Sequence, residues 1–589
     1  MSGATAPAPP RDRPPARSIQ AMLDEGDACL ARRAYADAVQ HFAEAARHAP
    51  HDPAIRRWLI IALMRAGEIP SVLEQSEALL TLAPNDAESV RLVAYAYLEL
   101  HRQSRALLEW PGEPERVDTA AAGYPLPFFI PLAPSLLPHA VVLARLAVAN
   151  DPANAAALRT LAQALGEAGE YHEALTAARG AVRGGDGADA CLTLARLSAN
   201  AGLLADATDA IRDPILVSIA PSLATGRQLA VRYDAPEGGT AAPREVPVHL
   251  LRDGRFATRS VQVAHRAARC ETIHEAEVVG AHFFPVLADG TAKIHDVVEL
   301  DALHLSHPLP VDALPAADRA CTVLAHDRAS RRLWLHVPHD RGRYVERAAL
   351  LATNAHANYC HWLLGSLPRL LIAGDAADAL DAPWIVPHEL AAFQDETLNL
   401  LGIPHGRRLR LRDDETIRIG ELVVPYDPQC AGTPAPALVR GVRQRLLGGD
   451  VPARGHRRIY LSRRGVGGKR RLLNEPAVEA LFVDRGFEVV ETERMTVCEQ
   501  IALFREAAVV AGPTGAAFAN LIFAPPECRA VITIAQGFQS PIFCSVAEML
   551  GQEVLHVLGV ERPSALPHPH WHYAVALDDI RRALAWVER

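Results

Sequence analysis

The segment REAAVVAGPTGAAFANLIF, residues 505–523, indicates the fold class of the C-terminal half of the chain. An apolar run ends at Gly512, a tight turn follows through Pro513, Thr514 and Gly515, and an Ala-rich stretch comes next. This order is typical of a strand that enters a helix in an α/β sheet. We expect Thr514 to be the N-cap of that helix. Because a helix N-terminus favours a phosphate, the turn is a candidate anion site, and a plain structural cap is the alternative.

Strand-like and helix-like runs alternate on both sides of this turn, which predicts doubly wound parallel sheets. Downstream of residue 346 we expect strands at RAALLAT, PWIVP, RRIYLSR, FEVVE and AVITI, and helices near 391–401, 475–485, 497–507 and 577–587. Pro- and Gly-rich linkers near 435–452 separate two such units. Between about 215 and 345 the runs are short and β-like, with a hairpin turn expected at ADGT, residues 288–291.

A basic cluster follows the strand at RRIYLSR. The strand brings Ser462, Arg463 and Arg464 to its carboxyl end, and a Gly-rich loop then leads to Lys469, Arg470 and Arg471. The Walker A spacing is absent. The carboxyl ends of strands in an open α/β sheet bind anions, so the cluster is a candidate anion site in an otherwise acidic chain. A solvated basic loop is the alternative.

The N-terminal part of the chain repeats itself. Arg33, Gly67 and His101 lie 34 residues apart, each at a turn between helical patterns, and Pro50 and Pro84 keep the same interval. After a Pro-rich break at 111–138 the helical pattern resumes. The pattern resembles tetratricopeptide repeats, whose period is about 34 residues. An aperiodic helical bundle is the alternative.

Composition restricts the class of protein. The chain has 589 residues, a hydrophobic fraction of 49% and a net charge of −9, which fits a multidomain globular protein and argues against nucleic acid as a partner. Its nine cysteines show no C-x-x-C pair, which favours reduced thiols. The first 17 residues predict a solvated tail rather than a signal peptide, and no run is long enough for a membrane span. We therefore expect a cytoplasmic protein.

Three ordered blocks resemble glycosyltransferase family 61. They are NYCHWLLGSLPRL at 358–370, the segment from Ser462-Arg463-Arg464 through RRLLNE at 470–475, and the turn segment described first. The resemblance covers about 245–560. It implies a two-lobed GT-B enzyme with two Rossmann-like domains, a nucleotide-sugar donor and inversion at the anomeric carbon. No convincing D-x-D element is present, so we expect neither a metal nor another cofactor; the run Asp413-Asp414-Glu415 is expected to be solvated.

The resemblance also assigns roles to residues. It implies a general base at His361, provided that this side chain does not merely stabilise its helix. Asn358 and Trp362 are expected on the acceptor side. The donor-binding residues are expected to be Arg463, Arg464, Arg470, Asn474, Glu475, Gly512, Pro513, Thr514, Gly515 and Asn520.

Two positions depart from the family pattern. Thr514 occupies the place where the family turn commonly has a histidine, and Gly365 replaces an acidic residue that often follows the His-Trp pair. Both changes affect the expected site, so a catalytically degenerate scaffold whose repeats bind other proteins is the alternative function.

The predicted organisation has four parts: a disordered tail at 1–17, helical repeats at 18–212, an N-terminal GT-B lobe at 213–445 and a C-terminal lobe at 446–589. The predicted function is metal-independent, inverting transfer of a hexosyl or pentosyl group. The expected partners are a nucleotide sugar, a glycan or protein acceptor, a protein bound by the repeats, and further copies of the chain.

Overall fold

The computed structural model describes most of the chain. The described ranges are 18–32, 34–66, 69–108, 133–233, 244–263, 268–293, 311–327, 330–339, 342–379, 381–426, 434–449, 452–466, 470–538, 540–562 and 572–589. The tail expected at 1–17, the repeat positions Arg33 and Gly67, most of the Pro-rich break and Lys469 lie outside the described residues.

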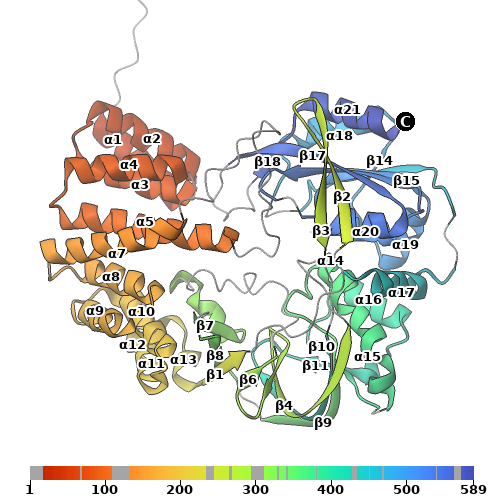
Figure 1. The fold of residues 1–589 in the computed structure, drawn as a ribbon, viewed down its shortest axis with the longest axis horizontal. Helices are drawn as coiled ribbons and strands as arrows, with labels where there is room; N and C mark the ends of the chain where they lie inside the picture. Colours follow the sequence, from red (N-terminus) through yellow and green to blue (C-terminus); the bar gives the residue numbers. More distant parts are fainter. Residues whose placement is uncertain are drawn as a thin grey trace, which may run out of the picture.

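The N-terminal part is an array of antiparallel helical hairpins, on the left in Figure 1. Its helices are α1 (Ile19–Ala31), α2 (Tyr35–His48), α3 (Pro53–Ala66), α4 (Ile69–Leu82), α5 (Ala87–Leu108), α7 (Ala133–Asn150), α8 (Ala155–Glu167), α9 (Tyr171–Arg183), α10 (Gly187–Asn200), α11 (Leu204–Ile211), α12 (Pro214–Ile219) and α13 (Ser222–Thr225). Small side chains such as Ala162 and Ala174 are fully buried between neighbouring helices, which allows the helix axes to approach closely. Gly169 and Gly202 have left-handed φ angles of 79° and 80° where α8 and α10 end.

A ten-stranded sheet follows the array. In spatial order its strands are β11 (Arg408–Leu411), β10 (Trp384–Pro387), β9 (Arg343–Leu350), β12 (Thr416–Tyr426), β4 (Arg269–Val279), β5 (Phe284–Leu287), β6 (Thr291–Ala292), β1 (Arg227–Tyr233), β8 (Arg332–Val337) and β7 (Thr322–Asp327). The sheet is mixed: its strands from about residue 343 onward form a parallel portion, as predicted for that region, and strands of the β-like region at 215–345 supply the antiparallel pairs. The parallel pairs are those of the β11–β10–β9–β12 portion and the β6–β1 pair, and β12 runs antiparallel to β4 over most of its length.

The second sheet has eight strands, and its central part is parallel as predicted. Its strands are β14 (Glu488–Val490), β13 (Arg457–Leu461), β15 (Ala507–Pro513), β16 (Arg529–Ala535), β17 (Glu553–Arg562), β2 (Arg244–Arg252) and β3 (Arg255–Val263), with β18 (His572–Ala574) beside β17. Helices α18 (Glu475–Val483) and α21 (Leu577–Val587) cover one face. Helices α19 (Val497–Arg505) and α20 (Ile542–Leu550) and the 3₁₀ helix η5 (Ala516–Phe523) cover the other.

The remaining helical elements lie beside or between the two sheets. They are the 3₁₀ turns η1 (Val311–Asp318), η3 (His405–Arg407) and η4 (Thr492–Arg494), the α-helical turn α14 (Tyr359–His361), the π-helical turn η2 (Trp362–Ser366), and the helices α15 (Pro368–Ala379), α16 (Ala392–Leu400) and α17 (Pro436–Leu447).

The hairpin of β2 and β3 joins the second sheet, although its residues fall within the range expected for the first lobe (Figure 1). Strand β2 pairs in parallel with β17, with Leu251 opposite Val557. The carboxylate of Asp579 accepts hydrogen bonds from the backbone N–H groups of Asp253 and Gly254 at 2.8 and 2.7 Å, which fixes the hairpin turn. The polypeptide therefore crosses between the sheets more often than a division at residue 445 implies.

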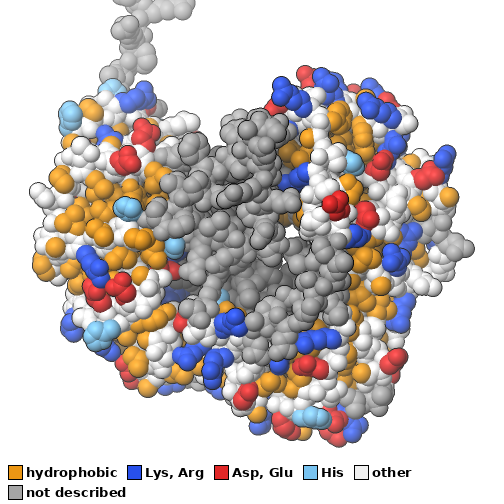
Figure 2. Space-filling view, viewed as in Figure 1, with side chains coloured by type: hydrophobic (Ala, Val, Ile, Leu, Met, Phe, Trp, Pro, Cys, Tyr) orange, Lys and Arg blue, Asp and Glu red, His pale blue; other side chains and the backbone are white. Residues whose placement is uncertain are grey.

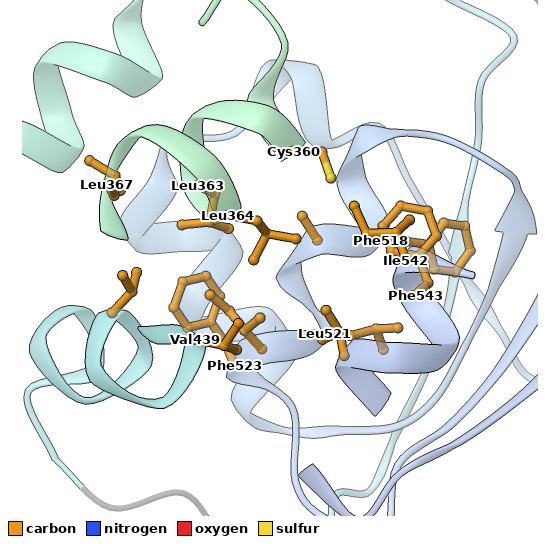
Figure 3. Packing of buried hydrophobic residues seen from close by; sticks show 14 of the residues in the cluster. Cys360, Leu363, Leu364, Leu367, Val439, Phe518, Leu521, Phe523, Ile542 and Phe543 are labelled. Atoms are coloured by element: carbon orange, nitrogen blue, oxygen red, sulfur yellow. The ribbon is translucent and has the colours of Figure 1, made fainter. Parts of the chain in front are cut away.

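One hydrophobic core spans elements from both sides of the expected linker. Figure 3 shows apolar side chains of the segment from α14 to the residue after η2 facing those of η5 and α20, with α17 beside them. The labelled residues are Cys360, Leu363, Leu364 and Leu367 on the first side, Phe518, Leu521, Phe523, Ile542 and Phe543 on the second, and Val439 of α17. All of these side chains are at least nine-tenths buried. The segment that carries His361 is consequently packed directly on the helix that follows the Gly512–Gly515 turn.

Candidate functional site

The predicted turn lies at the carboxyl end of β15, but it is not a conventional helix start. The backbone N–H of Thr514 donates to the carbonyl of Thr533 at 2.9 Å, so pairing with β16 extends one residue beyond the strand. The helix that follows is the 3₁₀ helix η5, and Gly515 is its cap residue, without a side-chain hydrogen bond. The prediction that Thr514 is the N-cap is therefore wrong, because this residue still belongs to the strand ladder.

Gly512 is required by the packing of the sheet. Its φ of 150° disfavours other residues, and a Cβ atom there would lie 2.5 Å from the carbonyl oxygen of Leu461 on β13. Gly515 matters for the position of the Arg463 side chain rather than for the packing of the sheet. Its backbone is extended, but a Cβ atom there would lie 3.1 Å from Cδ of Arg463, so its bare backbone leaves room for that side chain.

Arg463 and the turn meet at the same edge of the sheet. The guanidinium of Arg463 donates from Nη1 to the carbonyl oxygen of Thr514 at 2.5 Å. Its backbone N–H donates to Glu475 Oε1 at 2.7 Å. Burial lowers the pKa of Arg463 from its ordinary value of 12.5, and the neighbouring Tyr573 and Glu475 partly oppose that shift. The guanidinium is thus a partly desolvated cation beside the Gly512–Gly515 turn.

Three neighbours in the basic segment serve mainly as structural partners. Glu475 is 4% exposed, and burial raises its pKa above the ordinary 4.5. Arg464 donates to Glu479 on α18 at 2.7 Å. The side chain of Asn474 donates to the carbonyl oxygen of Val575 at 2.8 Å and accepts from the Val575 N–H at 3.2 Å. These bonds hold the loop after β13 against β18 and α18.

Arg470 contacts the loop that follows β16. Its φ of 54° is left-handed, and its guanidinium carbon lies 3.9 Å from the centre of the Phe538 ring in the loop after β16. Leu472 bridges Tyr573 of β18, so this contact joins the loop after β13, where it lies beside β18, to the loop after β16. Phe538 was not among the predicted site residues, since only the folded sheet brings the two loops together.

Asn520 lies inside the protein rather than at the sheet edge. It is fully buried, accepts a hydrogen bond from the Tyr359 hydroxyl at 2.6 Å and donates to Gln500 Oε1 at 2.7 Å. Burial raises the pKa of Tyr359, so its phenol stays protonated as the donor. Asn520 thereby joins α14 to α19 in the interior of the protein.

The segment expected near the acceptor divides into exposed and buried residues. Asn358 is exposed and caps α14, accepting from the N–H groups of Cys360 and His361 at 2.9 and 3.4 Å. Trp362 is fully buried, and its indole donates to Thr397 at 2.9 Å. The prediction that Trp362 lines the acceptor side is therefore not met, because its ring belongs to the shared core.

The imidazole of His361 differs from its neighbours. It is half-buried, and no hydrogen bond joins its ring to any residue that the structure describes. Burial lowers its pKa from the ordinary 6.5, which keeps the ring neutral and able to accept a proton at neutral pH. The π-helical turn η2 begins directly after it, with the N–H of Leu367 bonded to the Trp362 carbonyl at 2.9 Å. Such turns recur at functional sites.

Tyr573 was missed by the sequence analysis although it lies behind Arg463. Its ring is fully buried, and its hydroxyl donates to the Thr533 carbonyl at 2.7 Å. Burial raises its pKa, and the charge of Arg463 acts in the opposite direction. No sequence signal marks this residue, because β18 is a strand of three residues, distant along the chain from β13.

The acidic run at 413–415 is solvated as predicted only at Asp413, which is exposed. Asp414 and Glu415 are 7% and 0% exposed. Asp414 pairs with Arg412 at 3.0 Å, and Glu415 pairs with Arg343 at 2.5 Å. The two carboxylates are buried because these arginines compensate their charge. Within the described residues, no group of three or more His, Cys, Asp or Glu side chains has the arrangement of a metal site.

Comparison with known proteins separates the chain into two recognised segments. Residues 359–531 match the family profile described as Glycosyltransferase 61. Residues 30–96 match the profile of a tetratricopeptide repeat. Both resemblances noted in the sequence are thus confirmed. The glycosyltransferase match includes α14, His361, Arg463 and the whole Gly512–Gly515 turn.

Several solved structures resemble about a third of the chain. TTC0263, a thermophilic TPR protein of Thermus thermophilus, is 20% identical with a TM-score of 0.28, over 35% of this chain and 92% of that one. MamA 41-end from Desulfovibrio magneticus RS-1 is 17% identical with a TM-score of 0.24, over 33% of this chain and 90% of that one. No curated protein sequence matches the chain significantly. Among the described helices, none has the length and apolar character needed to cross a bilayer.

Proposed function

We propose that the chain is a metal-independent, inverting glycosyltransferase that transfers a sugar from a nucleotide-sugar donor to a glycan or protein acceptor. The observation that carries the proposal is the contact of the Arg463 guanidinium with the Gly512–Gly515 turn, inside the segment that matches the glycosyltransferase family. A departing diphosphate gains negative charge, and a partly desolvated guanidinium beside backbone N–H groups stabilises such charge.

The proposed reaction needs a base and a leaving-group site. The acceptor hydroxyl oxygen attacks the anomeric carbon from the side opposite the diphosphate, and the bond from that carbon to the diphosphate oxygen breaks. The nucleoside diphosphate leaves with the electron pair toward Arg463, and the hydroxyl proton passes to the neutral imidazole of His361. In this proposal the donor lies on the second sheet, within a GT-B arrangement of two lobes, and the helical repeats hold the acceptor or a partner protein.

A thermal-shift screen of nucleotide sugars and nucleoside diphosphates tests the donor site. A bound ligand stabilises the folded protein, so the correct donor is expected to raise the Tm of the wild type. Arg463→Ala should abolish that shift. Arg458→Ala, at the opposite end of the same strand, is the matched control and should retain it, since Arg458 bonds to the Arg485 carbonyl away from the turn. The best ligand is then tested for sugar transfer by product analysis.

One observation favours a catalytically degenerate scaffold as a second candidate. Arg463, Glu475 and Asn520 already have protein hydrogen-bond partners, and Thr514 replaces the histidine of the family turn. A scaffold of this kind would show no donor hydrolysis and no transfer with any nucleotide sugar. Measurable turnover that is lost in His361→Ala would exclude the scaffold.

A further inference from the structure

A cavity of about 270 Å³ lies where the last repeat hairpin meets the ten-stranded sheet. The turn between α10 and α11 lines one side of it, and strands β1 and β8 line the other. Its volume is just below the ~300 Å³ that marks the lower end of typical small-molecule sites. The cavity is therefore suited to a ligand smaller than a nucleotide sugar, and it is separate from the residues around Arg463.

The register of β1 and β8 arranges the strand wall of this cavity. Arg232 lies directly opposite Arg332, and Ala230 lies directly opposite Trp334. Side chains alternate along a strand, so these four residues share the face that is turned toward α10. Trp334 is 3% exposed and belongs to the core beneath α10. The strand side of the cavity thus has an apolar part, formed by Ala230 and Trp334, next to a pair of guanidinium groups.

The opposed arginines require an explanation. Directly opposite Cβ atoms in an antiparallel pair are about 5 Å apart, and like charges there destabilise the sheet. Neither Arg232 nor Arg332 forms an ion pair or side-chain hydrogen bond with any residue that the structure describes. Asp327, opposite Arg332 on β7, accepts from Ser330 at 3.4 and 2.5 Å. Neither guanidinium is therefore held in an ion pair among the described residues, in a chain whose net charge is −9.

The repeat side of the cavity is shaped around one of these cations. Gly202 has a left-handed φ of 80°, and a Cβ atom there would lie 3.2 Å from Nη1 of Arg332. The bare turn lets the guanidinium lie against the α10–α11 connection. Figure 2 shows Lys and Arg side chains gathered over the region where the last repeat helices meet β1 and β8.

We propose that this junction is a second ligand site, which binds a phosphate monoester between Arg232 and Arg332 with its apolar part on Ala230 and Trp334. A guanidinium matches a phosphate group through paired, charge-assisted hydrogen bonds, and two of them relieve their mutual repulsion by sharing one dianion. Because the cavity has walls from the array and from the sheet, the bound ligand fastens the last repeat hairpin onto β1 and β8.

Phenyl phosphate is the probe that tests the site, with inorganic phosphate as the comparison. Calorimetry on the full chain is expected to show phenyl phosphate binding more tightly than inorganic phosphate, because only the ester uses the apolar part formed by Ala230 and Trp334. The double variant Arg232→Gln/Arg332→Gln should bind at least tenfold more weakly. Arg418→Gln is the matched control, an exposed arginine of the same sheet, and should bind like the wild type.

Two further measurements locate the ligand and guard against misfolding. Phenyl phosphate should slow the hydrogen exchange of backbone amides at residues 199–204 and 332–337. The same slowing should be measured in Arg463→Ala. Without ligand, the double variant should keep or exceed the wild-type Tm at low salt, since it removes a repulsion. Equal affinity of the double variant and the wild type, protection confined to the turn at 512–515, or no binding to the wild type overturns the proposal.

Discussion

At the scale of single residues, the polar side chains of the candidate site differ in whether they already have hydrogen-bond partners within the protein. Arg463 and Glu475 are tied to each other and to the turn, whereas the ring of His361 has no hydrogen-bond partner among the described residues. A neutral, half-buried imidazole at the start of a π-helical turn is the side chain with spare capacity to accept a proton. This difference makes His361 the more informative residue for kinetics.

The pH dependence of transfer should report His361. Its pKa lies below 6.5 because burial disfavours the imidazolium, and only the neutral ring accepts a proton. Initial rates under kcat/KM conditions should be independent of pH above that pKa and should fall tenfold per unit below it. His361→Ala should lower the rate about 10²–10⁴-fold and remove the acidic limb. An acidic limb that persists in the variant would assign the base to another group.

At the scale of elements, two glycines in one turn have separable tasks. In Gly512→Ala the new Cβ atom would meet the backbone of β13 at 2.5 Å, and φ is unfavourable, so the free energy of unfolding should fall by about 2–5 kcal/mol. In Gly515→Ala the contact at 3.1 Å is with a flexible side chain and φ is −172°. That variant should stay within about 1 kcal/mol of the wild type.

Nucleotide binding should show the opposite order for the two substitutions. Gly515→Ala displaces Arg463 and should lose the nucleotide-induced rise in Tm, while the folded fraction of Gly512→Ala should retain it. Denaturant titration and thermal shift on the same samples measure both quantities. If Gly515→Ala binds the nucleotide normally, Arg463 does not act through its contact with the turn.

The hydrogen bond between Tyr359 and Asn520 connects α14 to η5. Tyr359→Phe leaves the buried Asn520 Oδ1 without its 2.6 Å donor, which should cost about 1–3 kcal/mol of unfolding free energy. A double-mutant cycle with Asn520→Ala should give a coupling of about 1 kcal/mol or more. Tyr344→Phe, a tyrosine that is 56% exposed, is the control and should change little. Additive effects in the cycle would mean that the bond does not join the two elements.

The sequence predicted local elements better than their partners. The closing helix at 577–587 has the predicted bounds, and the helices expected at 475–485 and 497–507 are present, because their apolar period is local information. The helix after Gly515 is 3₁₀ and not α, since Thr514 remains in the strand ladder and the turn is drawn tight. The first sheet is mixed because β12 pairs with β4, a contact that no period along the chain encodes.

The candidate site was predicted only in part for the same reason. Arg463 and the Gly512–Gly515 turn come together as expected, because strand ends in a parallel sheet share one edge. Asn520 and Trp362 instead lie in the interior: Trp362 packs in the shared core, and Asn520 accepts a hydrogen bond from the Tyr359 hydroxyl. Burial in that core depends on α14 packing on η5, and neither segment alone reveals it.

At the scale of the whole molecule, buried histidines make stability depend on pH. Burial lowers the pKa of His282, His336, His356 and His556 from 6.5 to about 4. Between these values the unfolded chain binds more protons than the folded one, so the free energy of unfolding falls as pH decreases through this window. The dependence on these groups vanishes above pH ~7.

Each of these histidines should contribute up to about 3 kcal/mol to that loss by pH 4, because one pKa unit corresponds to about 1.4 kcal/mol. Urea titrations at several pH values measure the slope. His556→Gln should flatten it between pH 6.5 and 4, whatever its effect at neutral pH. A slope identical to that of the wild type would show that this imidazole is already charged in the folded state.

The hairpin of β2 and β3 has a consequence for how the chain is made. Strand β2 is translated roughly 300 residues before β17, the strand with which it pairs, with Leu251 opposite Val557. At about 5–20 residues per second, the nascent hairpin waits some tens of seconds beyond the ribosome before that partner emerges. An open strand edge during this interval can pair with a neighbouring polypeptide. Yield of the native chain should therefore improve when synthesis is slow to initiate and nascent chains are sparse.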